Sequence, residues 1–284
     1  MSPRLAKKRA PPDPARSPLR PVLNLNHIGV LLRDEQQPFP LPDIRQLFDG
    51  HGIALTVIED GGTLPEDLDL VMAMGGDGTV LRALDLCPET PVLAINYGTV
   101  GFLTAGDRDD LAAILQRLVA GDYILSERLC LECRHPGGVV RAVNEVMVRS
   151  SNRLVFVDVF VDDTKIRTIC GDGVVLGTPT GSTGFLLSAG APIVMPEVRC
   201  LILDGINEYN FSSRSLIVTP EARIRLSISR ETREPEVILT ADGRRITTLR
   251  PGVDLEVASS SRTARLVYFE PSYFFHNLTS KLSW

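Results

Sequence analysis

A mostly apolar stretch at residues 68–74 runs straight into Gly75-Gly76-Asp77-Gly78-Thr79, and an amphipathic helical pattern follows. This order predicts a buried strand, a glycine turn and a helix. Glycines let backbone N–H groups at the start of a helix approach an anion closely. The turn is not the dinucleotide fingerprint GxGxxG, because Leu81 stands where the third glycine would be, and no Gly-Lys-Ser/Thr follows as in a Walker loop. We expect a phosphate-binding turn of another kind.

The pattern of the chain changes near residue 125. Before this point, short apolar stretches of strand length alternate with helical patterns, of which residues 110–120 are the clearest. Such alternation is typical of a parallel sheet covered by helices. After it, segments rich in Val, Ile and Leu follow one another with few helical stretches. We therefore expect an α/β, Rossmann-like N-terminal domain at residues 25–125 and a β-rich, sandwich-like C-terminal domain at residues 126–270.

Composition excludes several classes of partner. The chain has 284 residues, of which 44% are hydrophobic, so a packed core is expected. No apolar stretch approaches the roughly 18 residues of a membrane span, and we expect no membrane partner. The net charge of −5 argues against a nucleic-acid partner, which calls for a basic surface. A small anionic ligand must instead be held by local dipoles and a metal.

The N-terminal residues and the cysteines bear on location. Residues 1–24 are basic and rich in proline, without the apolar region of a secretory signal. We expect a disordered tail, with a weak basic docking arm as the alternative. Five cysteines in such a chain indicate free thiols and a cytoplasmic location. Cys130 and Cys133 form a CxxC, but residues three apart on a strand face opposite sides, so we expect no zinc site.

Asp77 is the residue of the glycine turn that most needs an explanation. A carboxylate beside phosphates is electrostatically costly unless it holds a metal or takes a proton. Glycine on both sides provides no bulky neighbour to bury it. We expect Asp77 to have a chemical role. The alternative is an Asx turn that only shapes the loop.

Two further segments place polar residues in or after β-patterns. Asn144 and Glu145 interrupt a β-run and can reach one ligand together only at a bulge or strand end; the alternative is an edge pair that faces solvent. Residues 177–185, Gly-Thr-Pro-Thr-Gly-Ser-Thr-Gly-Phe, offer donors for a sugar or phosphate and an aromatic face for a base. Alternatively, this loop is a rigid turn in which Ser182 or Thr183 caps a helix.

In order and spacing, these segments resemble the motifs of the NAD kinase family. GGDGT alone is also found in lipid kinases and phosphofructokinase-like enzymes, and the combination is more specific. The resemblance extends over residues 26–284. Its segments are Gly75-Gly76-Asp77-Gly78-Thr79, Asn96-Tyr-Gly-Thr-Val-Gly-Phe-Leu103, Asn144-Glu145, Gly171-Asp172-Gly173 with residues 178–188, Ala241-Asp242-Gly243 and residues 273–284.

The resemblance implies transfer of the γ-phosphoryl group of ATP to the adenosine 2′-hydroxyl of NAD, with Asp77 as the catalytic proton acceptor. It implies an N-terminal domain that binds the ATP phosphates, a C-terminal domain that binds NAD, and a tail at residues 271–284 that packs back on the first domain. The implied phosphate-binding residues are Gly75, Gly76, Gly78 and Thr79. The implied NAD-binding residues are Asp77, Gly78, Arg82, Phe102, Asn144, Glu145, Asp172, Thr183, Gly184, Phe185 and Ser188.

The resemblance also implies Mg²⁺, or another divalent metal, carried by ATP without direct side-chain ligands, and a homodimer or homotetramer. Four positions depart from the family pattern: Gly184 and Phe185 stand where alanine and tyrosine are usual, Asp204 falls near a normally small residue, and Arg244 replaces the usual glutamine. They leave Asp77 and the glycine loops intact, so we expect altered affinity or preference, not loss of activity. The alternatives are a lipid or sphingoid-base kinase, a non-catalytic nucleotide sensor and, more distantly, a Rossmann oxidoreductase.

Overall fold

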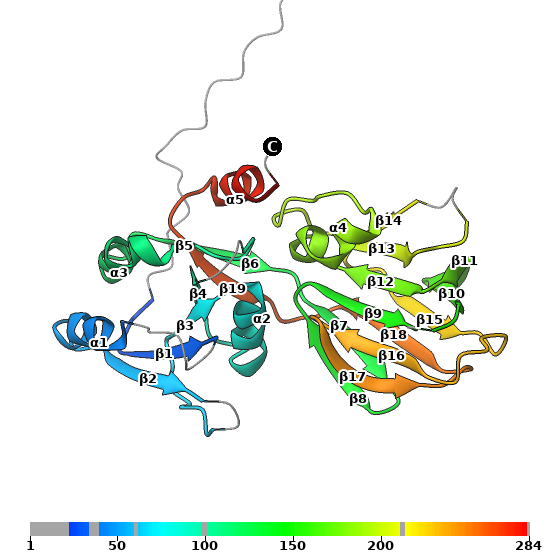
Figure 1. Ribbon diagram of the computed structural model, residues 1–284, viewed down its shortest axis with the longest axis horizontal. Helices are drawn as coiled ribbons and strands as arrows, with labels where there is room; N and C mark the ends of the chain where they lie inside the picture. The colour runs from blue at the N-terminus through cyan, green and yellow to red at the C-terminus, as the bar shows by residue number, and fades with distance from the viewer. Residues whose placement is uncertain are drawn as a thin grey trace, which may run out of the picture.

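The computed structural model describes residues 23–33, 40–59, 62–97, 101–150, 152–210 and 214–282. Almost all of the expected N-terminal tail lies outside these residues, as do residues 98–100 of the second motif and the last two residues of the chain. Figure 1 shows two lobes side by side, with the C-terminal helix above the place where they meet.

The first lobe is built on a seven-stranded sheet in the order β2-β1-β3-β4-β19-β6, with β5 paired to β4. All neighbouring strands are parallel except β19 and β6. The α/β, Rossmann-like class predicted from the sequence is confirmed. The strands are β1 (His27–Leu32), β2 (Ala54–Ile58), β3 (Leu70–Gly75), β4 (Val92–Asn96), β5 (Gly106–Asp107), β6 (Ile124–Arg128) and β19 (Ala264–Tyr268).

Helices cover both faces of this sheet because successive residues of its buried strands face opposite sides. In β3, Met72 packs in the layer of Phe48 and Leu118, whereas Val71 packs in the layer of Leu84. The helices are α1 (Leu41–Asp49) and α3 (Leu111–Val119) on one face and α2 (Asp77–Leu86) on the other; the short 3-10 helix η2 (Arg108–Asp110) precedes α3.

The second lobe is a sandwich of two six-stranded antiparallel sheets, as expected. Their facing sides share one apolar core, which includes Val148 and Leu239 from one sheet and Val157 and Leu226 from the other. One sheet contains β7 (Leu131–His135), β8 (Gly138–Ala142), β10 (Val155–Val161), β11 (Thr164–Gly171), β15 (Ile224–Ile228) and β18 (Asp254–Ser259). The other contains β9 (Glu145–Arg149), β12 (Gly173–Gly177), β13 (Leu201–Ile206), β14 (Leu216–Val218), β16 (Val237–Ala241) and β17 (Arg244–Leu249).

The second sheet also carries the hydroxyl-rich loop. The 3-10 helix η3 (Thr180–Thr183) and helix α4 (Phe185–Ala189) follow β12 and lie on the outer face of that sheet. There Leu186 packs against Met147, Val175 and Ile202 in a small core of its own.

The two lobes meet along the chain near residues 128 and 264, whereas the boundaries expected from the sequence were 126 and 270. β6 and β19 both belong to the first sheet, where Ala264 pairs with Arg128. The chain therefore leaves the first lobe after Arg128 and returns to it at Ala264. An apolar pattern predicts that a strand exists, but it does not say which strand it will pair with.

Helix α5 (Tyr273–Leu282) occupies most of the expected C-terminal tail. The side-chain amide of Asn277 donates to the carbonyl oxygens of Phe102 and Thr104, both at 3.1 Å. The ring of Tyr273 stacks on Tyr268 of β19 with centroids 3.6 Å apart. The helix therefore packs on the first lobe. Among the described residues, no helix is long and apolar enough to cross a membrane.

Candidate active site

Asp77 is the first residue of α2, directly after the turn that ends β3. Its Oδ2 accepts the N–H of Phe102 at 2.9 Å, and its Oδ1 accepts the N–H of Leu103 at 3.0 Å. Burial raises the pKa of the Asp77 carboxyl, while the two N–H donors and the charge of Lys281 oppose the rise. The carboxylate is thus partly buried and held by the backbone on both oxygens.

The burial of Asp77 corrects one sequence expectation. Its glycine neighbours were expected to leave it unburied, but a loop 25 residues away covers it. Gly101 is required for this approach, because a Cβ at that position would lie 2.5 Å from Asp77 Oδ1. The carboxylate of Asp77 therefore binds the backbone of a loop that is distant in the sequence. The Asx-turn alternative instead had it shape its own turn.

The glycines of the turn differ from one another. A Cβ at Gly76 or Gly78 would have no atom within 4 Å, so their backbone borders open space. A Cβ at Gly75 would lie 2.2 Å from the hydroxyl oxygen of Thr79, which is buried, and the Thr79 N–H donates to the carbonyl oxygen of Gly76. Gly76 and Gly78 thus leave room for a ligand, whereas Gly75 and Thr79 pack on each other.

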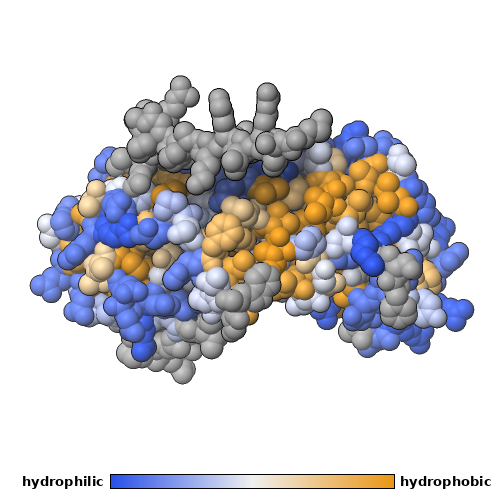
Figure 2. All heavy atoms as spheres, turned by 90° about the horizontal axis from the view of Figure 1, so that it is seen from above, coloured by the Kyte–Doolittle hydropathy of each residue, from blue (hydrophilic) through white to orange (hydrophobic). Residues whose placement is uncertain are grey.

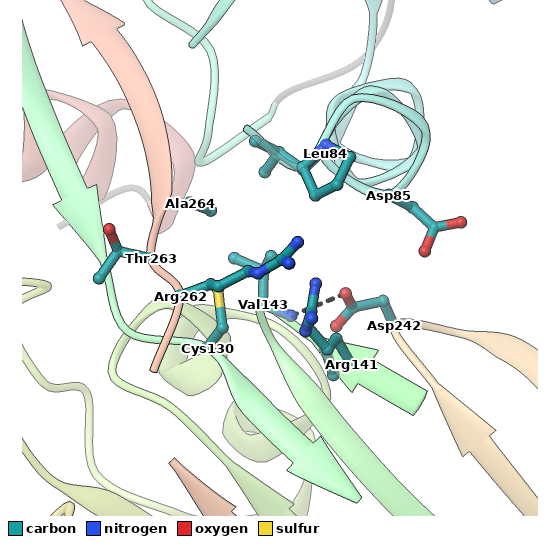
Figure 3. Close-up of a pocket in the computed structure, with 11 residues that line it drawn as sticks. Leu84, Asp85, Cys130, Arg141, Val143, Asp242, Arg262, Thr263 and Ala264 are labelled. Atoms are coloured by element: carbon teal, nitrogen blue, oxygen red, sulfur yellow. Dashed lines mark hydrogen bonds between the residues drawn. The ribbon is translucent and has the colours of Figure 1, made fainter. Parts of the chain in front are cut away.

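Asp242 holds the backbone of residues 143–145. The residue lies in the turn between β16 and β17 with a φ of 48°. Its carboxylate accepts the N–H groups of Val143 and Asn144 at 2.8 Å and of Glu145 at 3.2 Å; Figure 3 shows the bond to Val143. Asp242 belonged to the family segment 241–243, but the sequence prediction did not include it among the site residues.

Asn144 and Glu145 each carry a buried oxygen without a hydrogen-bond partner among the described residues: Asn144 Oδ1 and Glu145 Oε2. Glu145 is 5% exposed, and burial, with a contribution from the charge of Asp242, raises its pKa to about 7. The pair does not face solvent, so the edge-strand alternative is wrong. Buried oxygens of this kind are normally paired, and a ligand with hydroxyl or N–H groups would supply the missing donors.

The hydroxyl-rich loop lies directly on this pair. A Cβ at Gly181 would be 2.3 Å from the carbonyl oxygen of Asn144. Thr178 donates to the carbonyl of Val143 at 2.6 Å, and Ser182 donates to that of Pro179 at 2.6 Å. These two hydroxyls are fully buried and bind the loop to its own backbone, but neither Ser182 nor Thr183 caps a helix, because α4 begins after Gly184 without a side-chain cap.

Gly184, one of the departures, borders the unpartnered oxygens. A Cβ there would lie 3.4 Å from Asn144 Nδ2 and from Glu145 Oε2. Phe185 begins α4, and Ser188 is exposed on the same helix. Phe102 and Arg82 are half-buried on the other lobe, in the loop over Asp77 and on α2.

Asp172 does not lie near Asn144 and Glu145. It precedes β12 at Gly173, whereas Glu145 pairs with Gly177 at the other end of the strand. At about 3.4 Å per residue, roughly 15 Å separate Asp172 from Glu145 along the sheet. Its carboxylate accepts a hydrogen bond from Asn207 at 2.7 Å.

Arg128 connects the two lobes and had no sequence signal. The residue is 2% exposed, and its guanidinium donates to the hydroxyls of Tyr268 and Tyr273 at 3.0 Å and of Thr180 at 3.4 Å. The Tyr268 hydroxyl in turn donates to the carbonyl of Leu103 at 3.1 Å. A buried arginine thus links the loop over Asp77 to the hydroxyl-rich loop.

A second connection explains the departure at Arg244. Its guanidinium binds both carboxylate oxygens of Asp85 on α2, at 2.5 and 2.7 Å. Asp85 also lines a pocket of about 80 Å³ between the lobes, together with Arg141 and Asp242 (Figure 3). Within the described residues, no three His, Cys, Asp or Glu side chains gather as metal ligands.

Comparison with known proteins identifies the family. The family model described as the ATP-NAD kinase N-terminal domain matches residues 60–123, and the ATP-NAD kinase C-terminal domain matches residues 143–269. An NAD kinase of Syntrophotalea carbinolica is 35% identical over 79% of this chain and 81% of its own length. An NAD kinase of Symbiobacterium thermophilum is 39% identical over 76% of this chain and 79% of its own.

Solved structures agree in fold. An NAD kinase from Archaeoglobus fulgidus in complex with ATP superposes with a TM-score of 0.74 at 26% identity, covering 90% of this chain and 98% of that one. Yeast NADH kinase complexed with NADH has a TM-score of 0.81 at 22% identity, covering 92% and 88%. From these matches and the motifs of its two lobes, the chain belongs to the NAD kinase family.

Proposed function

We propose that this chain transfers the γ-phosphoryl group of ATP to the adenosine 2′-hydroxyl of NAD and so forms NADP. The observation that supports this acceptor best is the pair of buried, unpartnered oxygens on Asn144 and Glu145. They call for a ligand rich in hydroxyl and N–H groups, such as a dinucleotide. A lipid or sphingoid-base kinase would need an apolar pocket at this place, and the relatives named NAD kinase do not favour it.

The ATP phosphates are proposed to lie on the turn before α2. The backbone at Gly76 and Gly78 borders open space at the start of the helix, where N–H groups and the helix dipole favour an anion. Gly75 and Thr79 shape the turn from beneath. Mg²⁺, or another divalent metal, carried by ATP would neutralise charge on its phosphates.

Asp77 is proposed to accept the proton of the 2′-hydroxyl. Its place at the start of α2 puts the carboxylate beside the proposed phosphates, and the N–H groups of Phe102 and Leu103 fix its orientation. A carboxylate is a weak base toward an alcohol, so it acts as the hydroxyl becomes acidic in the transition state. Positioned bases contribute about 10²–10⁴-fold.

NAD is proposed to lie across the two lobes. Asn144 and Glu145 would accept from the ribose and nicotinamide side, and Thr183, Gly184, Phe185 and Ser188 would contact the adenosine side. Phe102 would pack near the base, and Arg82 would approach a phosphate. Gly184 leaves room beside Glu145 Oε2 that the alanine usual in the family would narrow.

We propose that the chain works as a homo-oligomer. Asp172 lies at the other end of β12 from Glu145, apart from the other proposed NAD-binding residues, and a second copy would bring its own Asp172 to the site. Figure 2 looks down on the side that carries α5 and shows a band of hydrophobic side chains across the second lobe. Exposed apolar side chains include Val198 and Ile217 of the second lobe and Phe275 of α5. Sedimentation of the wild type and of Ile217→Asp tests this, and a monomeric wild type would contradict it.

One coupled assay tests the activity. NADP formation is measured with NAD and Mg-ATP and with polyphosphate in place of ATP, and a separate arm measures phosphorylated lipid with diacylglycerol in place of NAD. NADP with ATP is the expected result, whereas tight NAD binding without product would favour the nucleotide-sensor alternative. The free thiols at Cys87, Cys130, Cys133, Cys170 and Cys200 support the proposed cytoplasmic location.

A further inference from the structure

Helix α5 and Asp77 are held by the same short segment of backbone. The N–H groups of Phe102 and Leu103 donate to Asp77, and the carbonyl oxygens of Phe102 and Thr104 accept from Asn277 of α5. One side of residues 102–104 therefore fixes the carboxylate, and the other fixes the helix. The position of α5 relative to Asp77 is set by direct hydrogen bonds.

Lys281 lies one turn beyond Asn277. Residues four apart on a helix share a face, so Lys281 follows Asn277 toward the loop over Asp77. Its charge acts on the Asp77 carboxyl, which makes it the charged side chain that opposes the effect of burial there. Among the described residues, Lys281 has no ion pair within 4 Å that would hold its ammonium elsewhere.

Phosphoryl transfer beside Asp77 brings negative charges together. The transferred group carries negative charge on its oxygens, and a carboxylate beside it adds another. The chain as a whole is acidic, with a net charge of −5. A positioned cation that meets the charge formed in the transition state lowers the barrier, and a lysine ammonium is a compact point charge suited to this.

Resting on the proposed function, we propose that Lys281 is a catalytic residue: α5 carries its ammonium to Asp77, where it contacts the phosphoryl group during transfer to the 2′-hydroxyl. The C-terminal helix is then part of the active site. Its docking through Asn277 and Tyr273 positions the cation, while the turn before α2 positions the phosphates.

The test compares Lys281→Met with Lys281→Arg and a matched control. Lys165→Met removes the exposed lysine of β11, which pairs with Asp158 at 2.7 Å, far from the site. We expect Lys281→Met to lower kcat by about 10²-fold with KM for NAD within twofold of wild type. Lys281→Arg should restore most of kcat, and Lys165→Met should match wild type. An unchanged kcat in Lys281→Met, or an equal loss in the arginine variant, would overturn the proposal.

Two further readouts separate catalysis from folding. The thermal midpoint of Lys281→Met should stay close to that of Lys165→Met. The acid limb of its kcat profile should move to higher pH, because the lost charge no longer opposes the rise in the pKa of Asp77. A wild type that forms no NADP would overturn the proposed function, whereas an active wild type matched by Lys281→Met would overturn only the role of Lys281.

Discussion

The first and second lobes contribute buried acidic groups that differ in their hydrogen bonding. Asp77 has a backbone donor on each carboxylate oxygen, at 2.9 and 3.0 Å. Asn144 and Glu145 have their backbone N–H groups tied to Asp242, yet Asn144 Oδ1 and Glu145 Oε2 have no donor among the described residues. The protein itself supplies hydrogen-bond donors to both oxygens of Asp77, but it supplies none to Asn144 Oδ1 or Glu145 Oε2 among the described residues.

This difference separates two uses of a buried carboxylate. A group whose oxygens are already paired keeps its orientation without ligand, which suits a residue that must act at one moment of a reaction. A group left unpaired lowers stability until a ligand supplies donors, because a buried acceptor without a partner costs about 1–3 kcal/mol. A ligand that donates to these oxygens removes this cost, so the free energy lost in folding is regained on binding.

The largest effect is expected at the paired group. Asp77→Asn should lower kcat by about 10²–10⁴-fold, since the amide keeps the shape but not the basicity, while NAD still binds. Steady-state rates and a direct NAD titration measure both. The control is Asp43→Asn, an exposed acid in the first turn of α1, which should behave as wild type. Near-normal turnover in Asp77→Asn would remove its catalytic role.

The next largest effect is expected at Asp242, whose carboxylate holds the backbone of Asn144 and Glu145. Asp242→Ala leaves the N–H groups of Val143, Asn144 and Glu145 without their acceptor. A hydrogen bond to a charged group is worth about 1.5–3 kcal/mol, so we expect a loss of about 3 kcal/mol of unfolding free energy in urea and a higher KM for NAD. Unchanged stability would show that the carboxylate does not hold this turn.

A smaller and opposite effect on stability is expected at the unpaired group itself. Glu145→Gln removes the charge that burial disfavours, so the thermal midpoint should rise. KM for NAD should rise about tenfold, which corresponds to about 1.4 kcal/mol of lost binding. A variant that is both less stable and equally active would contradict the idea that Glu145 is kept for the ligand.

The gain in stability expected for Glu145→Gln depends on pH. In the folded protein burial raises the pKa of Glu145 to about 7, above its ordinary value of 4.5. The folded state therefore binds the proton more tightly than the unfolded state, so its stability falls as the pH rises from about 4.5 to 7. The gain in thermal midpoint of Glu145→Gln should be larger at pH 8 than at pH 5. Equal gains would place the carboxyl in a more solvated setting.

The smallest effect is expected for the interlobe ion pair. Arg244 and Asp85 are each nearly half exposed, with side chains 45% and 41% accessible, and exposed pairs contribute about 0–1 kcal/mol. Arg244→Gln, which restores the residue usual in the family, should change kcat less than twofold. A double-mutant cycle with Asp85→Asn measures the coupling. A large loss of activity would mean that the pair controls how the lobes meet.

Local patterns predicted much of this molecule. The glycine turn after an apolar strand placed Asp77 at the start of α2, and the change of pattern near residue 125 predicted a sheet with helices followed by a sandwich. These features depend on residues close in the sequence. The sequence also indicated polar segments in or after strands, at Asn144-Glu145 and at residues 177–185, because each segment is continuous in the chain.

Contacts between distant segments could not be predicted. The burial of Asp77 depends on a loop 25 residues away, and the support of Asn144 depends on Asp242, 98 residues away. Arg128 looks like any charged residue at the end of a strand, yet it is buried among hydroxyls from β19, α5 and η3. Spacing along the chain contains no information on which loops will meet.

The place of β19 in the first sheet has a consequence for how the protein is made. This strand comes from residues 264–268 and lies between β4 and β6, which the ribosome completes much earlier. Until it emerges, β4 and β6 have no strand to join them, and both offer open edges to other chains. A nascent or truncated polypeptide that ends before residue 264 therefore has every strand of the second lobe but an unfinished first sheet, which can be completed only at the end of synthesis.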